Sequence, residues 1–314
     1  MEYRQLGQTE LTVSRLCFGA LTVGPLQARL SLQEGAAVIA AALDAGVNFI
    51  DTAELYQTYD YIQQAIAGRN DIIIASKSYD WTYQGMQSSV ENACRSLGRD
   101  YVDLFMLHEQ TSRLTLKGHE AALEYLVHAK QKGIIRAAGI STHTVEVVRA
   151  AAMMEQVDVI HPIFNMAGIG ILDGTVEDMR DAISFASIQG KGIYTMKALG
   201  GGHLSNRSNE ALAWILEEPN IAAVAVGMQT NHEVLFNVSA FNQQSIDNKL
   251  QEIVQNRHRK LLVEDGCMGC GNCVAKCPMQ ALYFTSGQVA VDRDKCILCG
   301  YCGAYCSEFA LKII

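Results

Sequence analysis

The chain has 314 residues, of which 49% are hydrophobic and 18% are charged, and its formal net charge is −8. This composition permits a sizeable core and excludes widespread disorder. The charge argues against a nucleic-acid surface, because phosphate binding needs clustered Lys and Arg and the one short run is Arg257, Arg259 and Lys260. The apolar runs are too short for a membrane span, and the first twenty residues lack the apolar stretch of a signal peptide. We therefore expect a cytoplasmic protein with no membrane partner and no nucleic-acid partner.

Short apolar or β-branched segments alternate with longer segments of helical period between residues 15 and 240. A capping box of Ser31 and Glu34 predicts the start of the first helix, and Gly46 predicts its end. Eight segments are predicted strands, and they begin at Arg15, Val47, Ile72, Val102, Ile134, Val157, Gly192 and Ile221. Repeated βα units of this number predict a closed (β/α)8 TIM barrel, with a doubly wound open sheet as the alternative.

The segment after Phe241 is polar and has helical period, so it predicts a helix that leaves the barrel. Eight of the ten cysteines follow it, between Cys267 and Cys306. We place the domain boundary near Leu261. Residues 1–260 are then a barrel with its linker helix, and residues 261–314 form a small α+β domain.

Polar residues close several predicted strands, where a (β/α)8 barrel carries its catalytic groups. Asp51 closes the second strand, Lys77 the third and His108 the fourth, and Tyr56 follows Asp51. A buried Lys77 beside Asp51 would stay charged and lower the pKa of the Tyr56 phenol. Such a phenol can give a proton to a carbonyl oxygen while a hydride arrives at carbon, with His108 polarising the same carbonyl.

Each of these four residues also has a purely structural interpretation. Asp51 could cap a loop, and Lys77 could be an exposed residue at a strand end. Tyr56 could pack against a helix, and His108 could be a core histidine whose hydrogen bonds are satisfied. A single polar strand end seldom means catalysis. The joint pattern favours a carbonyl-reducing site.

At these residues the chain resembles the aldo/keto reductase family. The resemblance covers about residues 1–240 through "YRQLGQTELTVSRLCFGA", "DTAELY", "SLGRDYVDLFMLH" and "GMQTNHEVLFN". It implies a (β/α)8 barrel and a nicotinamide cofactor bound without a Rossmann domain. It also implies a catalytic tetrad of Asp51, Tyr56, Lys77 and His108, in which Tyr56 is the general acid.

The cofactor half departs from the family pattern at several positions. Where the family has a Ser-Asn pair, this chain has Ser141 and Thr142. His161 stands in place of the family's Gln, and Met196 in place of the aromatic residue that stacks on nicotinamide. The glycine-rich "KALGGGHL" lies where the family wraps the pyrophosphate. Together the resemblance implies cofactor contacts from Ser141, Thr142, His161, Asn165, Met196, Lys197, Leu199, Gly200, Gly227, Met228, Glu233 and Asn237.

The resemblance also bears on the choice between NAD(H) and NADP(H). Relatives often hold the 2′-phosphate of NADP with Lys, Ser and Arg, whereas this chain has Gly227, Met228 and Glu233 at those positions. A carboxylate repels a phosphate but accepts a hydrogen bond from a free ribose hydroxyl. We therefore expect a preference for NAD(H).

Two cysteine runs, "CMGCGNCVAKCP" and "CILCGYCGAYCS", share the C-x2-C-x2-C-x3-C spacing of bacterial ferredoxins. In that pattern the fourth cysteine of each run binds the other cluster. One 4Fe-4S cluster is expected on Cys267, Cys270, Cys273 and Cys306. The second is expected on Cys296, Cys299, Cys302 and Cys277. Zinc bound by four cysteines is the alternative.

Residues 261–314 accordingly resemble two-cluster ferredoxins, with Ser307 in place of the usual proline. Three functions remain open. The clusters could exchange electrons with the barrel site and a redox protein partner docked at the ferredoxin domain. The protein could instead be an ordinary NAD(P)H-dependent reductase of a small-molecule carbonyl or alcohol substrate, in which the ferredoxin domain is structural or docks a partner. It could also be an electron-transfer or redox-sensing protein whose barrel only binds a nucleotide.

Overall fold

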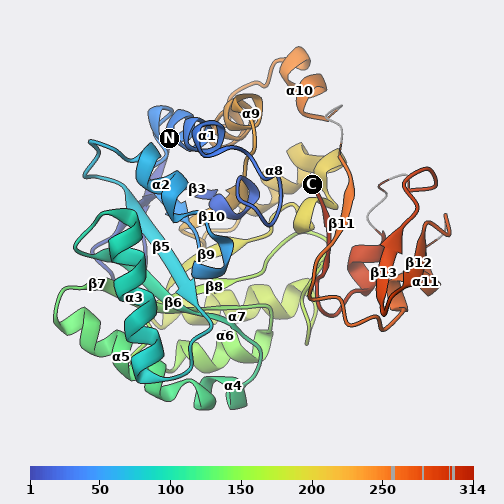
Figure 1. Ribbon diagram of the computed structural model, residues 1–314. Helices are drawn as coiled ribbons and strands as arrows, with labels where there is room; N and C mark the ends of the chain where they lie inside the picture. Colours follow the sequence, from blue (N-terminus) through green and yellow to red (C-terminus); the bar gives the residue numbers. More distant parts are fainter. Residues whose placement is uncertain (256–258, 278, 297, 299–300) are drawn as a thin grey trace.

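A closed barrel of eight parallel strands forms the larger part of the computed structural model, which describes residues 1–255, 259–277, 279–296, 298 and 301–314 (Figure 1). The last strand pairs with the first, and Val224 aligns with Leu16. In order around the barrel the strands are β3 (Leu16–Gly19), β4 (Phe49–Asp51), β5 (Ile73–Ser78), β6 (Val102–Gln110), β7 (Ile135–Thr142), β8 (Val159–Pro162), β9 (Gly192–Met196) and β10 (Ala223–Gly227). This closure confirms the predicted (β/α)8 fold and excludes the open sheet.

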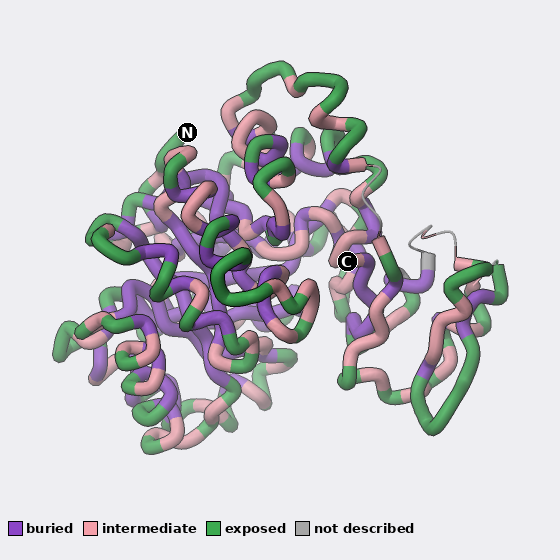
Figure 2. The backbone as a smooth tube through the Cα atoms, turned by 45° about the horizontal axis from the view of Figure 1, so that its top comes forward, coloured by how far each residue is buried: buried purple, intermediate pink, exposed green. Residues whose placement is uncertain are grey.

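Helices surround the barrel, and their apolar faces form one core with the outer faces of the strands (Figure 2). The Ser31 hydroxyl accepts from the Glu34 amide and the Glu34 carboxylate accepts from the Ser31 amide, as the capping box predicts. Gly98 ends its helix in the left-handed conformation, with a φ of 66°. The helices are α1 (Leu32–Asp44), α2 (Tyr59–Ala65), α3 (Tyr83–Leu97), α4 (Arg113–Gly118), α5 (Glu120–Gln131), α6 (Val145–Ala152), α7 (Val176–Ile188), α8 (Ser208–Leu216) and α9 (Asn231–Phe241).

A second core fills the barrel interior and extends to its amino-terminal end. It contains Phe49, Leu104 and Tyr194 from the strands, together with Leu6 and Leu11 from an N-terminal hairpin. The hairpin strands are β1 (Tyr3–Gln5) and β2 (Thr12–Ser14), which the sequence had not indicated. Short 3-10 turns complete the loops: η1 (Ala20–Thr22), η2 (Glu54–Tyr56), η3 (Gly200–Gly202) and η4 (Ser205–Arg207).

The linker is helical over a shorter range than predicted. Its helix is α10 (Asn248–Gln255), and residues 242–247 separate it from α9. The Asp247 carboxylate accepts hydrogen bonds from the amides of Lys249 and Leu250, at 2.8 and 3.2 Å. The prediction of a continuous helix from Phe241 is therefore wrong, because Asp247 caps a new helix start. No described helix is both long and apolar enough to cross a membrane.

The C-terminal domain consists of two small antiparallel sheets around a short helix. Strands β11 (Leu261–Val263) and β14 (Leu311–Ile313) pair, as do β12 (Leu282–Thr285) and β13 (Gln288–Val291). Helix α11 (Asn272–Lys276) and the turn η5 (Tyr301–Tyr305) lie between them in sequence. Their small core includes Cys273 and Cys302.

This domain packs directly on the barrel through β14 and η3. Gly202 has a φ of +91°, and a Cβ atom there would lie 2.0 Å from the Ile313 carbonyl oxygen. The absence of a side chain lets the two backbones touch. His203 secures the contact by donating from Nε2 to the Leu311 carbonyl at 3.0 Å. The C-terminal domain therefore adjoins the loop that follows β9.

Candidate active site

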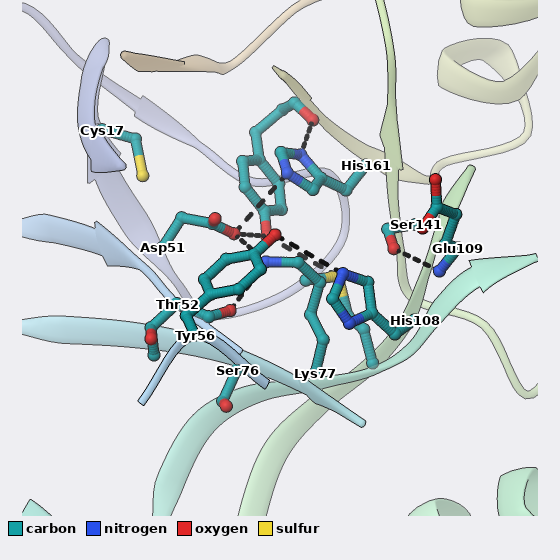
Figure 3. Close-up of polar contacts among 12 residues, drawn as sticks. Cys17, Asp51, Thr52, Tyr56, Ser76, Lys77, His108, Glu109, Ser141 and His161 are labelled. Carbon is teal, nitrogen blue, oxygen red and sulfur yellow. Dashed lines mark hydrogen bonds and ion pairs between the residues drawn. The ribbon is translucent and has the colours of Figure 1, made fainter. Parts of the chain in front are cut away.

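Asp51 and Lys77 form a buried ion pair at the carboxyl ends of neighbouring strands. Ala75 of β5 aligns with Asp51 of β4, so Lys77 extends two residues further toward the barrel mouth. Its ammonium donates to Asp51 Oδ1 and to the Thr52 carbonyl, both at 2.7 Å (Figure 3). Lys77 is 1% exposed and Asp51 is 5% exposed. The pair is thus satisfied on both sides, as a buried charge requires.

Tyr56 and His108 lie next to this pair and converge on it in the close-up (Figure 3). The Tyr56 hydroxyl is 3.4 Å from His108 Nε2, and the Lys77 ammonium is 5.1 Å from the centre of the Tyr56 ring. Tyr56 ends η2, and Gln57 after it has a φ of 56°. This turn directs the phenol back over the strand ends. The structure brings all four residues of the predicted tetrad together.

The pKa of the Tyr56 phenol is raised well above its ordinary value. Burial of the phenol end is the largest cause, and the Asp51 charge adds to it. The expected net lowering of this pKa is wrong, because burial and the Asp51 charge outweigh the attraction between the Lys77 ammonium and a phenolate. Burial and the Lys77 charge hold the pKa of His108 well below its ordinary value. At neutral pH the phenol is therefore protonated and the imidazole is neutral.

Asp51 has two further neighbours that the sequence did not indicate. The Tyr194 hydroxyl donates to Asp51 Oδ1 at 2.8 Å, and His161 Nε2 lies 3.5 Å from the same oxygen. The Tyr194 and His161 rings are stacked, with centroids 3.8 Å apart. The only sequence signal was that Tyr194 lies two residues before Met196, on the same face of an alternating strand.

A cleft extends from the tetrad over the strand ends β8 to β10. Asp51 and Tyr56 line its inner end. The predicted cofactor residues that line it are His161, Met196, Lys197, Leu199, Gly227, Glu233 and Asn237. The cleft therefore joins the tetrad to a large part of the predicted nucleotide site.

The other five predicted cofactor residues do not line this cleft. The Ser141 hydroxyl accepts from the Glu109 amide at 2.8 Å, and the Thr142 hydroxyl donates to the Gln110 carbonyl at 2.7 Å. Asn165 holds its own loop, donating to the Ile169 carbonyl at 2.9 Å. Gly200 and Met228 are buried. In this arrangement these five residues support the loops around the cleft.

Two features of the outer cleft were not foreseen. Lys312, Ile313 and Ile314 of the C-terminal domain contribute to its wall. The Glu233 carboxylate, the residue expected to select NAD(H), accepts from the Gln229 amide at 2.7 Å. The first feature could not be read from local pattern, because it depends on how the two domains pack.

A smaller cavity in the C-terminal domain is lined by Cys267, Cys270, Cys273 and Cys306. These are the four cysteines predicted to hold the first cluster. The Cys306 sulfur accepts a hydrogen bond from the Ala310 amide at 3.2 Å, which stabilises a thiolate. Within the described residues, no three His, Cys, Asp or Glu side chains converge closely enough to hold a single metal ion. Four cysteine sulfurs that line one cavity are the donor set that a 4Fe-4S cluster takes.

The second predicted ligand set is described in part. Cys299 lies outside the described residues. Cys277, Cys296 and Cys302 all belong to the core of the C-terminal domain or pack against it. The Cys277 sulfur accepts from the Ala281 amide at 3.3 Å. This bond repeats the one made by Cys306, as expected for two equivalent runs.

Comparison with known proteins supports a family assignment for the barrel and another for the C-terminal domain. The sequence pattern of the Aldo/keto reductase family matches residues 15–211, and that of the 4Fe-4S dicluster domain matches residues 259–307. The uncharacterized oxidoreductase YqkF of Bacillus subtilis is 25% identical over 241 residues, covering 69% of this chain and 74% of YqkF. L-galactose dehydrogenase of Arabidopsis thaliana is 22% identical over 288 residues, covering 77% of this chain and 89% of that dehydrogenase.

Two solved structures share the barrel. One, from Pseudomonas aeruginosa and provisionally assigned to the aldo-keto reductases, has a TM-score of 0.66 at 27% identity and covers 77% of this chain and 94% of its own. The other is the holo form of aldo-keto reductase AKR11C1 from Bacillus halodurans, with a TM-score of 0.67 at 23% identity. It covers 81% of this chain and 95% of its own, and it supports the fold alone.

Proposed function

Because the chain belongs to the aldo/keto reductase family, whose pattern matches residues 15–211, we propose that it interconverts a small carbonyl compound and its alcohol with Tyr56 as the general acid. The observation that carries this proposal is the Tyr56 hydroxyl at the inner end of the cleft, 3.4 Å from His108 Nε2 and beside the Lys77–Asp51 pair. A bound NAD(H) or NADP(H) supplies or accepts the hydride. The residues of the chain position the carbonyl and move the proton.

The protonation states support this assignment. Tyr56 keeps its proton at neutral pH, because burial raises its pKa. It releases the proton only when negative charge develops on the substrate oxygen, which is when general-acid catalysis is useful. The Lys77 ammonium then stabilises the phenolate that remains. Neutral His108 has one N–H, which can donate to the same substrate oxygen.

The cleft supports a nucleotide that lies across β8 to β10, and we retain the proposed preference for NAD(H). Glu233 lines the cleft, and a carboxylate disfavours a 2′-phosphate. The Gln229 amide already bonds to one of its oxygens. Titration of the protein with NADH and NADPH tests the preference, and equal or tighter binding of NADPH contradicts it.

We also propose that the C-terminal domain holds two 4Fe-4S clusters that communicate with the barrel site. The cavity lined by four cysteines includes Ala310 and Leu311, and the next residue, Lys312, lines the barrel cleft. This continuity favours communication over a purely structural domain. Clusters supply one-electron transfer when bound. A change in their electron paramagnetic resonance signal when NADH is added anaerobically tests this step.

The central experiment compares Tyr56→Phe with Tyr61→Phe in the full-length, anaerobically purified protein. Tyr61 donates to the Leu30 carbonyl at 2.9 Å and does not line the cleft. Tyr61→Phe therefore removes the same group, a phenol hydroxyl, at a site away from the cleft. Tyr56→Phe should lower NADH-dependent reduction of a panel of small aldehydes and ketones by about 10²- to 10⁴-fold, with nucleotide binding retained. Tyr61→Phe should leave the rate nearly unchanged. Undiminished activity in Tyr56→Phe contradicts the proposal and favours a barrel that only binds a nucleotide.

A further inference from the structure

A second set of ionisable side chains lies beside the tetrad, where the barrel meets the C-terminal domain. Glu109 is in β6, His143 follows β7 and Lys197 follows β9. The Lys197 amine bonds to His143 Nε2 at 3.0 Å, and Glu109 Oε1 lies 3.3 Å from His143 Nδ1. The order carboxylate, imidazole and nucleophile is the arrangement that enzymes use to orient and activate a nucleophile.

The backbone at both ends of this set is unusual. Glu109 has a φ of 51° and Lys197 a φ of 60°. Residues other than glycine seldom adopt this left-handed conformation, and at active sites it is kept where it places a side chain. Both strained residues therefore present their side chains to the same imidazole.

The surroundings of Lys197 favour its uncharged amine. Its Nζ lies 4.1 Å from the centre of the Phe309 ring, and the Lys312 Nζ lies 3.7 Å from the same centre. Lys312 is 5% exposed and has Glu264 at 3.3 Å, whereas no carboxylate of the described residues is within ion-pair distance of Lys197. Burial, followed by the Lys312 charge, lowers the pKa of Lys197 to about 7. A far larger share of Lys197 than of an ordinary lysine then carries a free amine at neutral pH.

Lys197 is also placed where a ligand can reach it. It lines the same cleft as Tyr56, Asp51 and His161. Lys77, by contrast, is engaged by Asp51 and the Thr52 carbonyl. A lysine desolvated beside a second cation is a known way to obtain a nucleophilic amine. Lys197 is desolvated, lies beside the Lys312 cation and is accessible from the cleft.

We propose that Lys197 is a nucleophile that captures carbonyl compounds in this cleft as a Schiff base, with His143 as the residue that orients its amine. In the first step the Nζ lone pair bonds to the carbonyl carbon, and the π electrons move to oxygen. A proton then passes from nitrogen to that oxygen and gives a carbinolamine. The hydroxyl next takes a proton from solvent and leaves as water, so that the C–O bond breaks and an iminium C=N bond forms. No oxidant or reductant is consumed.

Lys312 has a separate part in this chemistry. It belongs to β14 of the iron–sulfur domain, yet its ammonium shares the Phe309 ring with the Lys197 amine. Like charges repel, and the Lys312 charge is, after burial, the next largest cause of the lowered pKa of Lys197, so it favours the neutral amine. The C-terminal domain thus activates a nucleophile of the barrel, and detaching β14 deactivates it.

The experiment traps the adduct in the full-length, iron-loaded protein without nucleotide. Acetaldehyde is the carbonyl probe, sodium borohydride reduces the imine to a stable secondary amine, and peptide mass spectrometry gives the labelling rate of each lysine. At pH 7 Lys197 should be labelled about tenfold or more faster than the exposed Lys132, because it holds far more free amine. Lys197→Arg should remove the adduct. A Lys197 rate equal to that of Lys132, in protein with full iron content, overturns the proposal.

Two variants test the activation by Lys312. Lys312→Gln should lower the labelling of Lys197 at pH 7 and move its half-maximal labelling to higher pH. Lys276→Gln is the matched control, because Lys276 is exposed in the same domain and contacts Tyr305 instead. An unchanged pH profile in folded, iron-loaded Lys312→Gln overturns the assigned role of Lys312. Labelling that persists in Tyr56→Phe separates this chemistry from the proposed reduction, since the trap needs no nicotinamide.

Discussion

Tyr194 donates its phenol proton to Asp51 Oδ1 at 2.8 Å, and the Lys77 ammonium donates to the same oxygen at 2.7 Å. One carboxylate oxygen of β4 is therefore shared by a phenol from β9 and an ammonium from β5. His161 of β8 steadies the phenol by stacking on its ring and bonding to its backbone carbonyl at 2.7 Å. The orientation of the Lys77–Asp51 pair thus depends on four strands of the closed barrel.

Replacing Tyr194 by Phe should weaken both the ion pair and the reaction. The loss of a hydrogen bond to a buried carboxylate should lower the free energy of unfolding by about 2 kcal/mol. We expect a fall of about tenfold in kcat for carbonyl reduction, because a misplacement of the ion pair acts on the transition state. Steady-state kinetics and denaturant unfolding measure the two effects.

Tyr59→Phe is the matched control for this variant. Tyr59 is also buried, but its hydroxyl bonds to Ser76 at 2.6 Å and does not reach Asp51. It should lose stability without a comparable loss in kcat. Equal losses of kcat in the two variants would show that Tyr194 acts only through general stability.

Gly202→Ala should disturb the contact between the two domains. A Cβ atom at this position would meet the Ile313 carbonyl at 2.0 Å. Gly133 is the control, since it also has a positive φ, of +73°, but has no atom within 4 Å of its Cβ position. Gly133→Ala should cost about 1 kcal/mol from backbone strain alone. Gly202→Ala should cost more and should accelerate hydrogen exchange at 311–313. Normal exchange of β14 in Gly202→Ala would mean that the contact is not tight in solution.

Loss of a cluster ligand should remove iron selectively. If both runs bind clusters, Cys273→Ser should lower the iron content from about eight to about four atoms per chain, with sulfide falling in parallel. Cys94→Ser is the control, because Cys94 lies in α3, outside both runs. Iron and sulfide analysis of anaerobically purified protein measures this outcome. Zinc in place of iron and sulfide would contradict the cluster assignment.

Buried His161 should make stability depend on pH below neutrality. Burial lowers the pKa of His161 to about 4, so the folded protein resists a proton that the unfolded chain accepts near pH 6.5. Its contribution is therefore present above the unfolded pKa and is lost as pH falls toward 4. Between pH 7 and pH 5 the loss should be about 2 kcal/mol.

His161→Gln isolates this contribution, because glutamine keeps hydrogen-bonding groups but does not titrate. Denaturant unfolding at the two pH values should show a smaller pH-dependent loss in the variant, by about 2 kcal/mol. His108 and His143 also have lowered pKa values and act in the same direction in both proteins. An identical pH dependence would mean that the pKa of His161 is the same in the folded and unfolded states.

The sequence by itself determined the features that depend on local pattern. The alternation of strand and helix segments predicted all eight barrel strands. This was possible because the spacing of apolar residues along a segment reflects which face of the strand or helix is buried. The capping box at Ser31 and the glycine at Gly46 set the two ends of α1 through local hydrogen bonds and backbone freedom. Polar strand ends predicted the tetrad, because parallel strands of a barrel end at one rim.

Only the tertiary structure decided how these parts act on one another. The pKa of Tyr56 is raised because packing encloses the phenol, although the charge of Lys77 alone would have lowered it. Tyr194 reaches Asp51 through barrel closure, and Lys312 reaches the cleft through the packing of β14 on η3. Burial and electrostatic contact arise between residues far apart in the chain. A sequence pattern records which side of an element is apolar, but not which distant side chain it will meet.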